Sequence, residues 1–62
     1  MDINFKLIGK RIKEVRKQRS LTQADLAELT GMSNSYISYI ETAKKQASLE
    51  SLVQISNALE SL

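Results

Sequence analysis

Apolar residues recur at helical spacing along almost the whole chain of 62 residues. They stand three, four or seven places apart, as on a helix with one buried face, and no stretch alternates as a half-buried strand does. The first apolar stripe consists of Phe5, Ile8, Ile12 and Val15. The pattern therefore predicts an all-α fold whose first helix covers residues 3–18.

Three later segments begin with the same combination of residues. Each has a hydroxyl residue suited to an N-cap, with an apolar residue directly before it and another four places after it. These caps are Thr22, Ser33 and Ser48. They predict helices over residues 23–29, 34–41 and 49–59.

The connection between the second and third helices is very short, because only residues 30–32 separate them. The chain must turn sharply there, and Gly31 can adopt a left-handed conformation that a Cβ atom would oppose. Ala27 stands four places earlier, where a larger side chain would hold the two helices apart. The aliphatic residues expected in their shared core are Leu26, Ile37 and Ile40. These positions predict a helix-turn-helix from Gln23 to Glu41.

The composition narrows the possible functions. There is no cysteine and no histidine, so the chain lacks a thiolate, the commonest general base and the commonest metal ligand. We therefore expect no enzyme activity, no cofactor and no metal site. No apolar run approaches the roughly 20 residues of a membrane span, and residues 1–10 do not resemble a signal peptide. We expect one cytoplasmic domain over residues 1–62.

The charges are unevenly placed, although the net charge is only +2. Residues 1–20 contain seven Lys or Arg and two acidic residues, a net charge of +5, whereas residues 21–62 contain two and five, a net charge of −3. A basic segment favours nucleic acid, although it is also typical of a solvated helix face.

The positions that predict the helix-turn-helix also carry a family resemblance. These positions are Leu26, Ala27, Gly31, Met32, Ile37 and Ile40. In order and spacing they resemble the helix-turn-helix of the phage repressor and Cro-like family, also called the XRE family. The resemblance extends over roughly residues 8–59, because IGKRIKEVRKQRSLTQADLA is similar to that family's first two helices, YISYIETAKK to its recognition helix and SLESLVQISNAL to its fourth. It implies a compact, four- to five-helix, lambda-repressor-like domain. The implied function is that of a sequence-specific, DNA-binding transcription regulator, repressor-like and encoded by a bacterium or phage.

The resemblance also implies roles for individual residues. The recognition helix, residues 33–41, would enter the major groove. The positions that match base contacts are Ser33, Asn34, Ser35 and Tyr39. The positions that match phosphate contacts are Lys10, Thr22, Gln23, Lys44 and Lys45. Arg16 and Glu41 match a partly buried ion pair of the family, so we expect them to be structural. Without DNA, Ser33 would be only a cap, and Asn34 and Ser35 only solvated surface.

The chain departs from the family pattern after the recognition helix. Thr42-Ala43 replaces an Asn-Gly-like step, and Ala47 replaces a proline. The third helix is therefore expected to run longer, or the following loop to take a different shape. The third helix also has no Lys or Arg, so it cannot read guanine through a basic side chain.

The expected partner is double-stranded DNA with a pseudo-palindromic operator, bound by a homodimer. We expect the last helix to present Leu49, Leu52, Val53, Ser56 and Leu59 to the core. Its apolar residues near Ile55 and Leu62 are then the candidates for a dimer face. The chain is expected to be either a minimal domain or the N-terminal part of a longer regulator. An alternative function is a protein-interaction module of the antitoxin or adaptor kind, which the uncharged third helix also allows.

Overall fold

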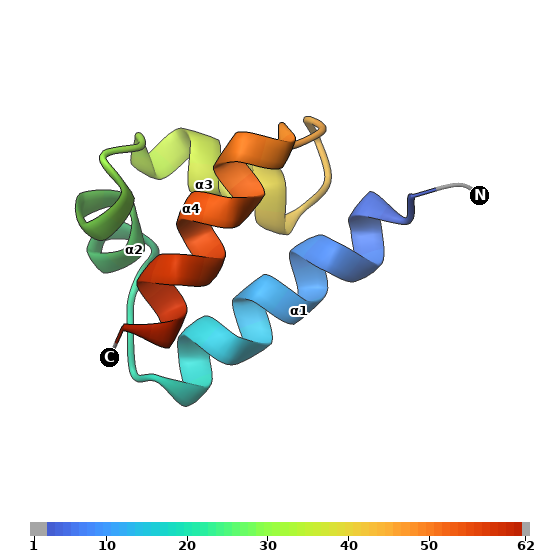
Figure 1. Ribbon diagram of the computed structural model, residues 1–62. Helices are drawn as coiled ribbons and strands as arrows, with labels where there is room; N and C mark the ends of the chain where they lie inside the picture. The colour runs from blue at the N-terminus through green and yellow to red at the C-terminus, as the bar shows by residue number, and fades with distance from the viewer. Residues whose placement is uncertain (1–2, 62) are drawn as a thin grey trace.

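The computed structural model describes residues 3–61, which form four helices and no strand (Figure 1). The helices are α1 (Phe5–Gln18), α2 (Gln23–Thr30), α3 (Asn34–Glu41) and α4 (Leu49–Glu60). The predicted all-α class is confirmed, and the later helices begin where their N-caps predict. The first helix begins two residues later than predicted because Asn4 caps it, with its Oδ1 accepting the Leu7 N–H at 3.0 Å.

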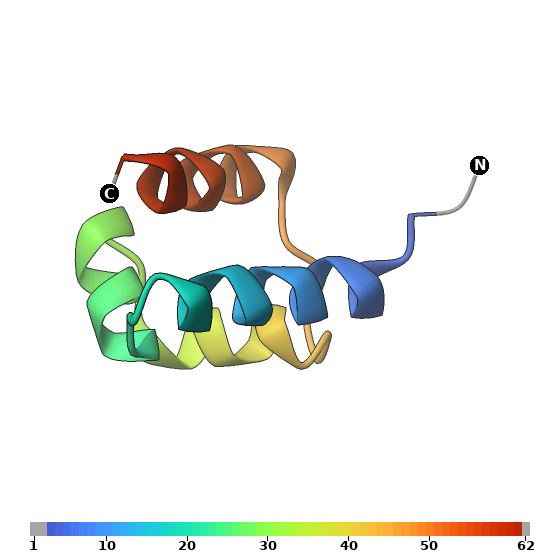
Figure 2. The same ribbon diagram turned by 90° about the horizontal axis from the view of Figure 1, so that it is seen from below.

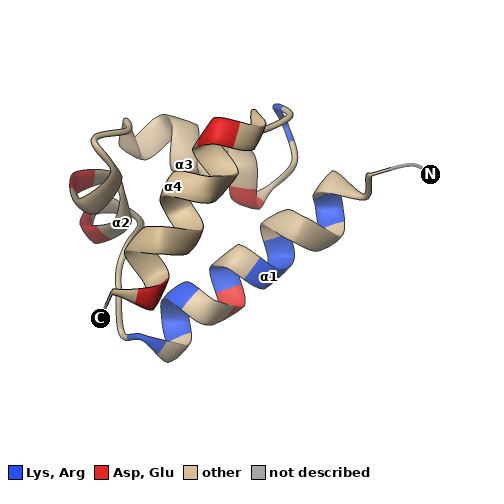
Figure 3. Ribbon diagram, in the orientation of Figure 1, with Lys and Arg blue, Asp and Glu red and all other residues tan. Residues whose placement is uncertain are grey.

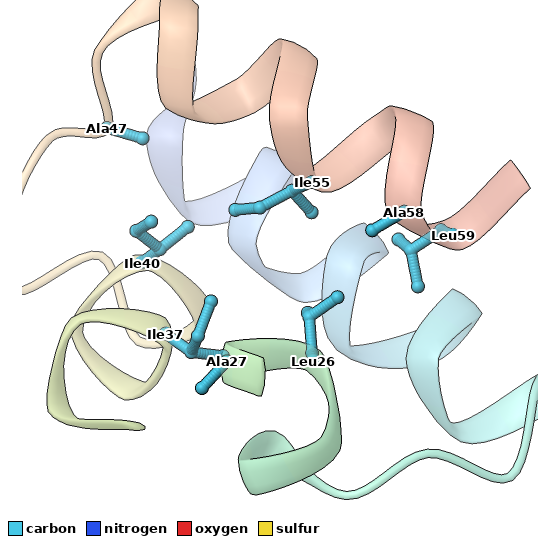
Figure 4. Packing of buried hydrophobic residues seen from close by; sticks show 8 residues of the cluster. All are labelled: Leu26, Ala27, Ile37, Ile40, Ala47, Ile55, Ala58 and Leu59. Carbon is cyan, nitrogen blue, oxygen red and sulfur yellow. The ribbon is translucent and has the colours of Figure 1, made fainter. Parts of the chain in front are cut away.

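The core lies between α4 and the α2–α3 pair. Seen from below, α4 and α3 lie at different levels, and α2 closes one end, where it contacts both of them (Figure 2). Side chains from α4, together with that of Ala47 before its N-cap, point toward those of α2 and α3 (Figure 4). The buried apolar residues are Leu26, Ala27, Ile37, Ile40, Ala47, Ile55, Ala58 and Leu59. The predicted shared core of the helix-turn-helix is therefore present.

The inner face of α4 differs from the predicted one. Leu49 is 79% exposed and Val53 50% exposed, and Ser56 is exposed as well. Leu49 and Val53 share their face with polar residues further along the helix, whereas Leu52, Ile55, Ala58 and Leu59 lie together on the face that packs inward. Ile55 is only 1% exposed, so it cannot belong to a dimer face, and Leu62 lies outside the described residues.

Gly9 allows α1 to approach α3 closely. It is buried, and a Cβ atom at this position would collide with the backbone oxygen of Ile40 and lie 2.8 Å from that of Glu41. Real Cβ atoms do not approach a backbone oxygen so closely, so a side chain here would force the two helices apart. The position of α1 on the helix-turn-helix therefore depends on a glycine that the apolar pattern did not single out.

Each of the first three helices is followed, within two residues of its end, by a residue with positive φ. These residues are Ser20 (59°), Gly31 (71°) and Ala43 (59°). After α3, the Lys44 N–H bonds the Tyr39 oxygen at 2.9 Å and the Ala43 N–H bonds the Ile40 oxygen at 3.2 Å, which is the Schellman pattern. The third helix therefore does not run longer. Ala43 instead takes the left-handed conformation that glycine adopts most easily.

We expect the Ala43→Gly variant to be more stable than the wild type. A Cβ in the left-handed conformation costs roughly 1–2 kcal/mol, and part of that gain is lost to the greater freedom of glycine in the unfolded chain. The net increase in the free energy of unfolding should be about 0.5–1 kcal/mol in urea titration. The control is Ala24→Gly at the exposed second position of α2, where glycine should destabilise by up to about 1 kcal/mol. A loss of stability in Ala43→Gly would contradict the left-handed assignment.

The first turn of α2 is closed by a reciprocal pair of hydrogen bonds. The Asp25 N–H donates to Thr22 Oγ1 at 3.0 Å, and the Thr22 N–H donates to Asp25 Oδ2 at 2.9 Å. This capping box was predicted from the spacing of the two residues. The bond from the Thr22 N–H also lowers the pKa of the Asp25 carboxyl, because it favours the charged form.

The lowered pKa of Asp25 predicts a pH-dependent contribution to stability. A carboxyl whose pKa is lower in the folded state stabilises the fold above its unfolded pKa, and this contribution is lost as the pH falls through the folded pKa. The contribution of Asp25 should therefore be intact above about pH 4, the ordinary range of an aspartate, and should be lost below it. Asp25→Ala should show a shallower decline in stability in that acid range. Urea titrations at several pH values measure this. Equal pH dependence in the two proteins would contradict the role given to Asp25.

Candidate nucleic-acid interface

The first turn of α3 presents a short, uncharged polar surface. Ser33 caps the helix, and its Oγ accepts the Tyr36 N–H at 3.0 Å. Asn34 and Ser35 follow and are exposed. Within residues 3–61, neither of these two side chains has a hydrogen-bond partner, so both are available to a ligand. Amide and hydroxyl groups can both donate and accept hydrogen bonds, as base edges in the major groove require.

The N-terminus of α2 is held by its own side chains. The hydroxyl of Thr22 accepts a hydrogen bond within the capping box, and the Gln23 Nε2 donates to Glu41 Oε1 at 3.1 Å. The first-turn N–H groups of a helix otherwise lack partners within the helix and carry a partial positive charge. This helix end therefore offers backbone donors to an anion, while the side chain of Gln23 braces α3.

A buried ion pair joins α1 to the end of α3. Arg16 Nε lies 2.7 Å from Glu41 Oε2, and Arg16 Nη2 lies 3.0 Å from Glu41 Oε1, which is a bidentate pair. Arg16 Nη1 also donates to the Leu21 oxygen at 2.7 Å. The two residues are only 6% and 7% exposed, and the hydrogen bonds with the Glu41 carboxylate raise the pKa of Arg16. The structure thus places both residues in the scaffold.

The exposed cations considered as phosphate contacts lie on α1 and in the loop that follows α3. Figure 3 shows Lys and Arg along α1 and in the loop after α3, whereas the charged residues of α2 and α4 are all acidic. Lys10, Lys44 and Lys45 are all exposed. The Lys45 Nζ lies 5.0 Å from the centre of the Tyr39 ring, a cation–π distance. Tyr39 therefore contacts a loop cation and is only half-buried.

The family resemblance implies that Gln23 braces the recognition helix, and its bond to Glu41 bears this out. Two other contacts that position the site were not predicted. They are the Gly9 approach described above and a hydrogen bond at 3.0 Å between Tyr36 Oη and Ser51 Oγ that joins α3 to α4. The hydroxyl of Ser48 also donates to Ser51 Oγ at 2.9 Å. The apolar pattern provided no signal for the two contacts between helices, because they depend on how the helices cross.

The short α2–α3 turn and the braced, exposed α3 define a helix-turn-helix domain. A family model described as helix-turn-helix matches residues 12–61. The chain belongs to this helix-turn-helix family, in its phage repressor and Cro-like (XRE) branch. No helix in residues 3–61 is both long and apolar enough to cross a membrane.

The relatives of the chain are regulators by name. It is 44% identical over 52 residues to the immunity repressor protein of Bacillus phage phi105. The aligned segment covers 84% of this chain and 36% of the relative. It is 36% identical over 58 residues to repressor protein C2 of Salmonella phage P22. This aligned segment covers 94% of the chain and 27% of the relative. The chain thus spans about a third or less of these two proteins.

A solved structure shares the fold. The chain superimposes on the restriction-modification controller protein C.AhdI from Aeromonas hydrophila with a TM-score of 0.88 and 30% sequence identity. The match covers 90% of this chain and 85% of that one. The predicted lambda-repressor-like arrangement is therefore confirmed for the described helices.

Proposed function

We propose that this chain is the DNA-binding domain of a repressor-like transcription regulator. The observation that carries the proposal is the exposed, uncharged first turn of α3, on a helix whose other end is anchored by the bidentate Arg16–Glu41 pair. A surface that reads base edges needs donors and acceptors in a fixed position, and this one meets both conditions. The relatives named as phage repressors support the same function. The protein would act by occupying its operator, without catalysis.

Base recognition is assigned to the N-terminal part of α3. Asn34 can make paired hydrogen bonds to adenine, while Ser33 and Ser35 can donate to or accept from several base edges. Ser33 can keep its cap while its hydroxyl also contacts DNA, since a hydroxyl donates one bond and accepts others. Tyr39, one turn further along, would touch the edge of the groove. No basic residue of α3 takes part, because α3 has none.

Phosphate binding is assigned to the groups around α3. The N-terminus of α2 at Thr22 and Gln23 would bind a phosphate mainly through backbone N–H groups, because both side chains already have partners in the protein. Lys44 and Lys45 would contact the backbone beyond the end of α3, and Lys10 would do so from α1. Tyr39 would hold Lys45 in place by its cation–π contact. These contacts supply affinity and salt dependence and leave sequence choice to α3.

The proposed target is a pseudo-palindromic operator bound by two copies of the chain in the bacterial cytoplasm. Two recognition helices related by a two-fold axis would read half-sites about one helical turn apart. Selection of bound duplexes from random DNA tests this proposal. A repeated motif with two related half-sites is expected. Failure to enrich any sequence at any salt concentration would contradict it.

Variants of Asn34 and Lys44 should separate base reading from phosphate binding. Asn34→Ala should relax the preference at one base pair of each half-site, at a cost of about 1–3 kcal/mol for the preferred base. Lys44→Ala should weaken all sequences about equally and make the salt dependence shallower by about one phosphate. Binding isotherms on the selected site and on single-base variants measure both effects. If Asn34→Ala weakened every sequence equally, its assignment to base reading would be wrong.

A further inference from the structure

A chain of three hydroxyl groups joins the first turn of α3 to the start of α4. Tyr36 Oη lies 3.0 Å from Ser51 Oγ, and Ser51 Oγ accepts a hydrogen bond from the Ser48 hydroxyl at 2.9 Å. Ser48 is the N-cap of α4, and its Oγ accepts the Ser51 N–H at 3.1 Å. The tyrosine hydroxyl is therefore bonded to a serine that the cap of α4 already holds in place.

The side chain of Tyr36 connects two helices whose backbones lie apart. Helices α3 and α4 lie at different levels of the molecule (Figure 2), so the connection needs a long side chain. The ring of Tyr36 is half-buried and packs against the apolar core, whereas its hydroxyl reaches Ser51. The ring thus contributes to packing, and the hydroxyl contributes a directional bond that can be removed separately.

The two ends of α3 are anchored in different ways. The last turn is held by the buried Arg16–Glu41 pair. Within residues 3–61, Tyr36 has the only side chain of the first turn that bonds another helix. A rise of about 1.5 Å per residue places Asn34 about 10 Å from Glu41 along the helix. An anchor at Glu41 alone would therefore leave the first turn free to tilt.

We propose that Tyr36 is a positioning residue for base recognition, and that its hydroxyl holds the first turn of α3 in place through Ser51. Tyr36 follows Ser35 directly, and its N–H is bonded to Ser33 Oγ. A shift of Tyr36 therefore moves both of these serines, which the proposed function assigns to base contacts. Such groups must lie within about 0.5 Å of the productive geometry. The inference rests on the proposed function and adds to it a residue that acts through its neighbours.

Tyr36→Phe tests the hydroxyl, because it keeps the ring and removes one oxygen. Binding isotherms are measured on the selected operator, on its variants at the base pair that Asn34 reads, and on an unrelated duplex. The preference for the operator over these variants should fall about five- to tenfold, which is part of what a base contact supplies. Affinity for the unrelated duplex should stay unchanged, because the phosphate contacts remain. A merely destabilising change would weaken all duplexes equally, since it lowers only the fraction of binding-competent protein.

Variants of α4 identify the partner of the hydroxyl. Ser51→Ala should reproduce the effect of Tyr36→Phe, and the double variant should lose about as much as either single one, because both changes remove the same bond between the helices. Ser51→Thr keeps a hydroxyl and should retain the wild-type preference. The matched control is Ser56→Ala, which changes an exposed serine of α4 whose hydroxyl has no partner within the described residues.

Amide hydrogen exchange without DNA gives a second measurement. Tyr36→Phe should speed exchange at residues 36 and 37 more than at residues 40 and 41, because the loosening is local to the first turn. Unchanged exchange at residues 36 and 37 would overturn the inference. So would an unchanged preference in Tyr36→Phe, or an equal loss on every duplex, while the wild type still selects a motif. A wild type that selects no motif would overturn the proposed function, and this inference with it.

Discussion

Replacing either partner of the Arg16–Glu41 pair alone will remove much of the stability of the domain. Arg16→Met leaves a buried carboxylate without its cation, and Glu41→Leu leaves a buried guanidinium, each at a cost of about 3–5 kcal/mol. A domain of this length has a total stability of only about 3–9 kcal/mol, so either loss removes much of it. The Leu21 oxygen and the Gln23 amide would also lose a partner in one variant or the other.

The double variant Arg16→Met/Glu41→Leu should be far more stable than the sum of the two single changes implies. Replacement of a buried ion pair by apolar side chains is often nearly neutral, because no uncompensated charge remains. Urea titrations in the Ala43→Gly background, where the single variants retain more folded protein, measure the full cycle. Lys17→Met, an exposed change next to Arg16, should cost less than about 0.5 kcal/mol. Additive effects of the two single changes would rule out the coupling.

Gly9→Ala will destabilise the domain, although the same change in most helix interiors stabilises it. Alanine normally gains about 0.5–1 kcal/mol over glycine within a helix. Here the added methyl group would collide with backbone oxygens at the end of α3, and backbone cannot rotate away as a side chain can. We expect a net loss of about 3 kcal/mol, at the upper end of what overpacking costs.

Circular dichroism during urea titration measures this loss. DNA binding gives a second readout, because α1 would have to move away from the recognition helix and strain the Arg16–Glu41 pair. Lys10→Ala, the next residue in α1 and an exposed one, is the control for stability. A Gly9→Ala variant as stable as the wild type would show that α1 does not pack on α3 in the described way.

The sequence predicted those parts of the fold that depend on local patterns. N-caps at Thr22, Ser33 and Ser48 determine where helices start, and the spacing of Ala27 and Gly31 determines the tight turn, because each acts within a few residues. The family resemblance supplied the pairing of Arg16 with Glu41, which stand 25 residues apart. Base and phosphate contacts remain predictions, since the described structure contains no DNA.

The sequence did not predict features that depend on how the helices pack. In α4, the spacing of the apolar residues allows a face through Val53 or a face through Ile55, and the packing against α2 and α3 buries Ile55. The end of α3 was also ambiguous, because local preference alone does not show that Ala43 will adopt a left-handed conformation. The left-handed Schellman turn is favoured after α3 because its two hydrogen bonds satisfy carbonyl groups at the helix end.

The central claim is that the uncharged first turn of α3 reads bases while Lys10, Lys44 and Lys45 bind phosphates, and the salt dependence of DNA affinity tests it most directly. The binding constant for the selected operator is measured over a series of salt concentrations. Three phosphates neutralised by Lys10, Lys44 and Lys45, at about 0.9 each, predict a log–log slope of about −2.7 per protomer. A slope near zero would contradict the claim and favour a protein-interaction module built on the same helix-turn-helix.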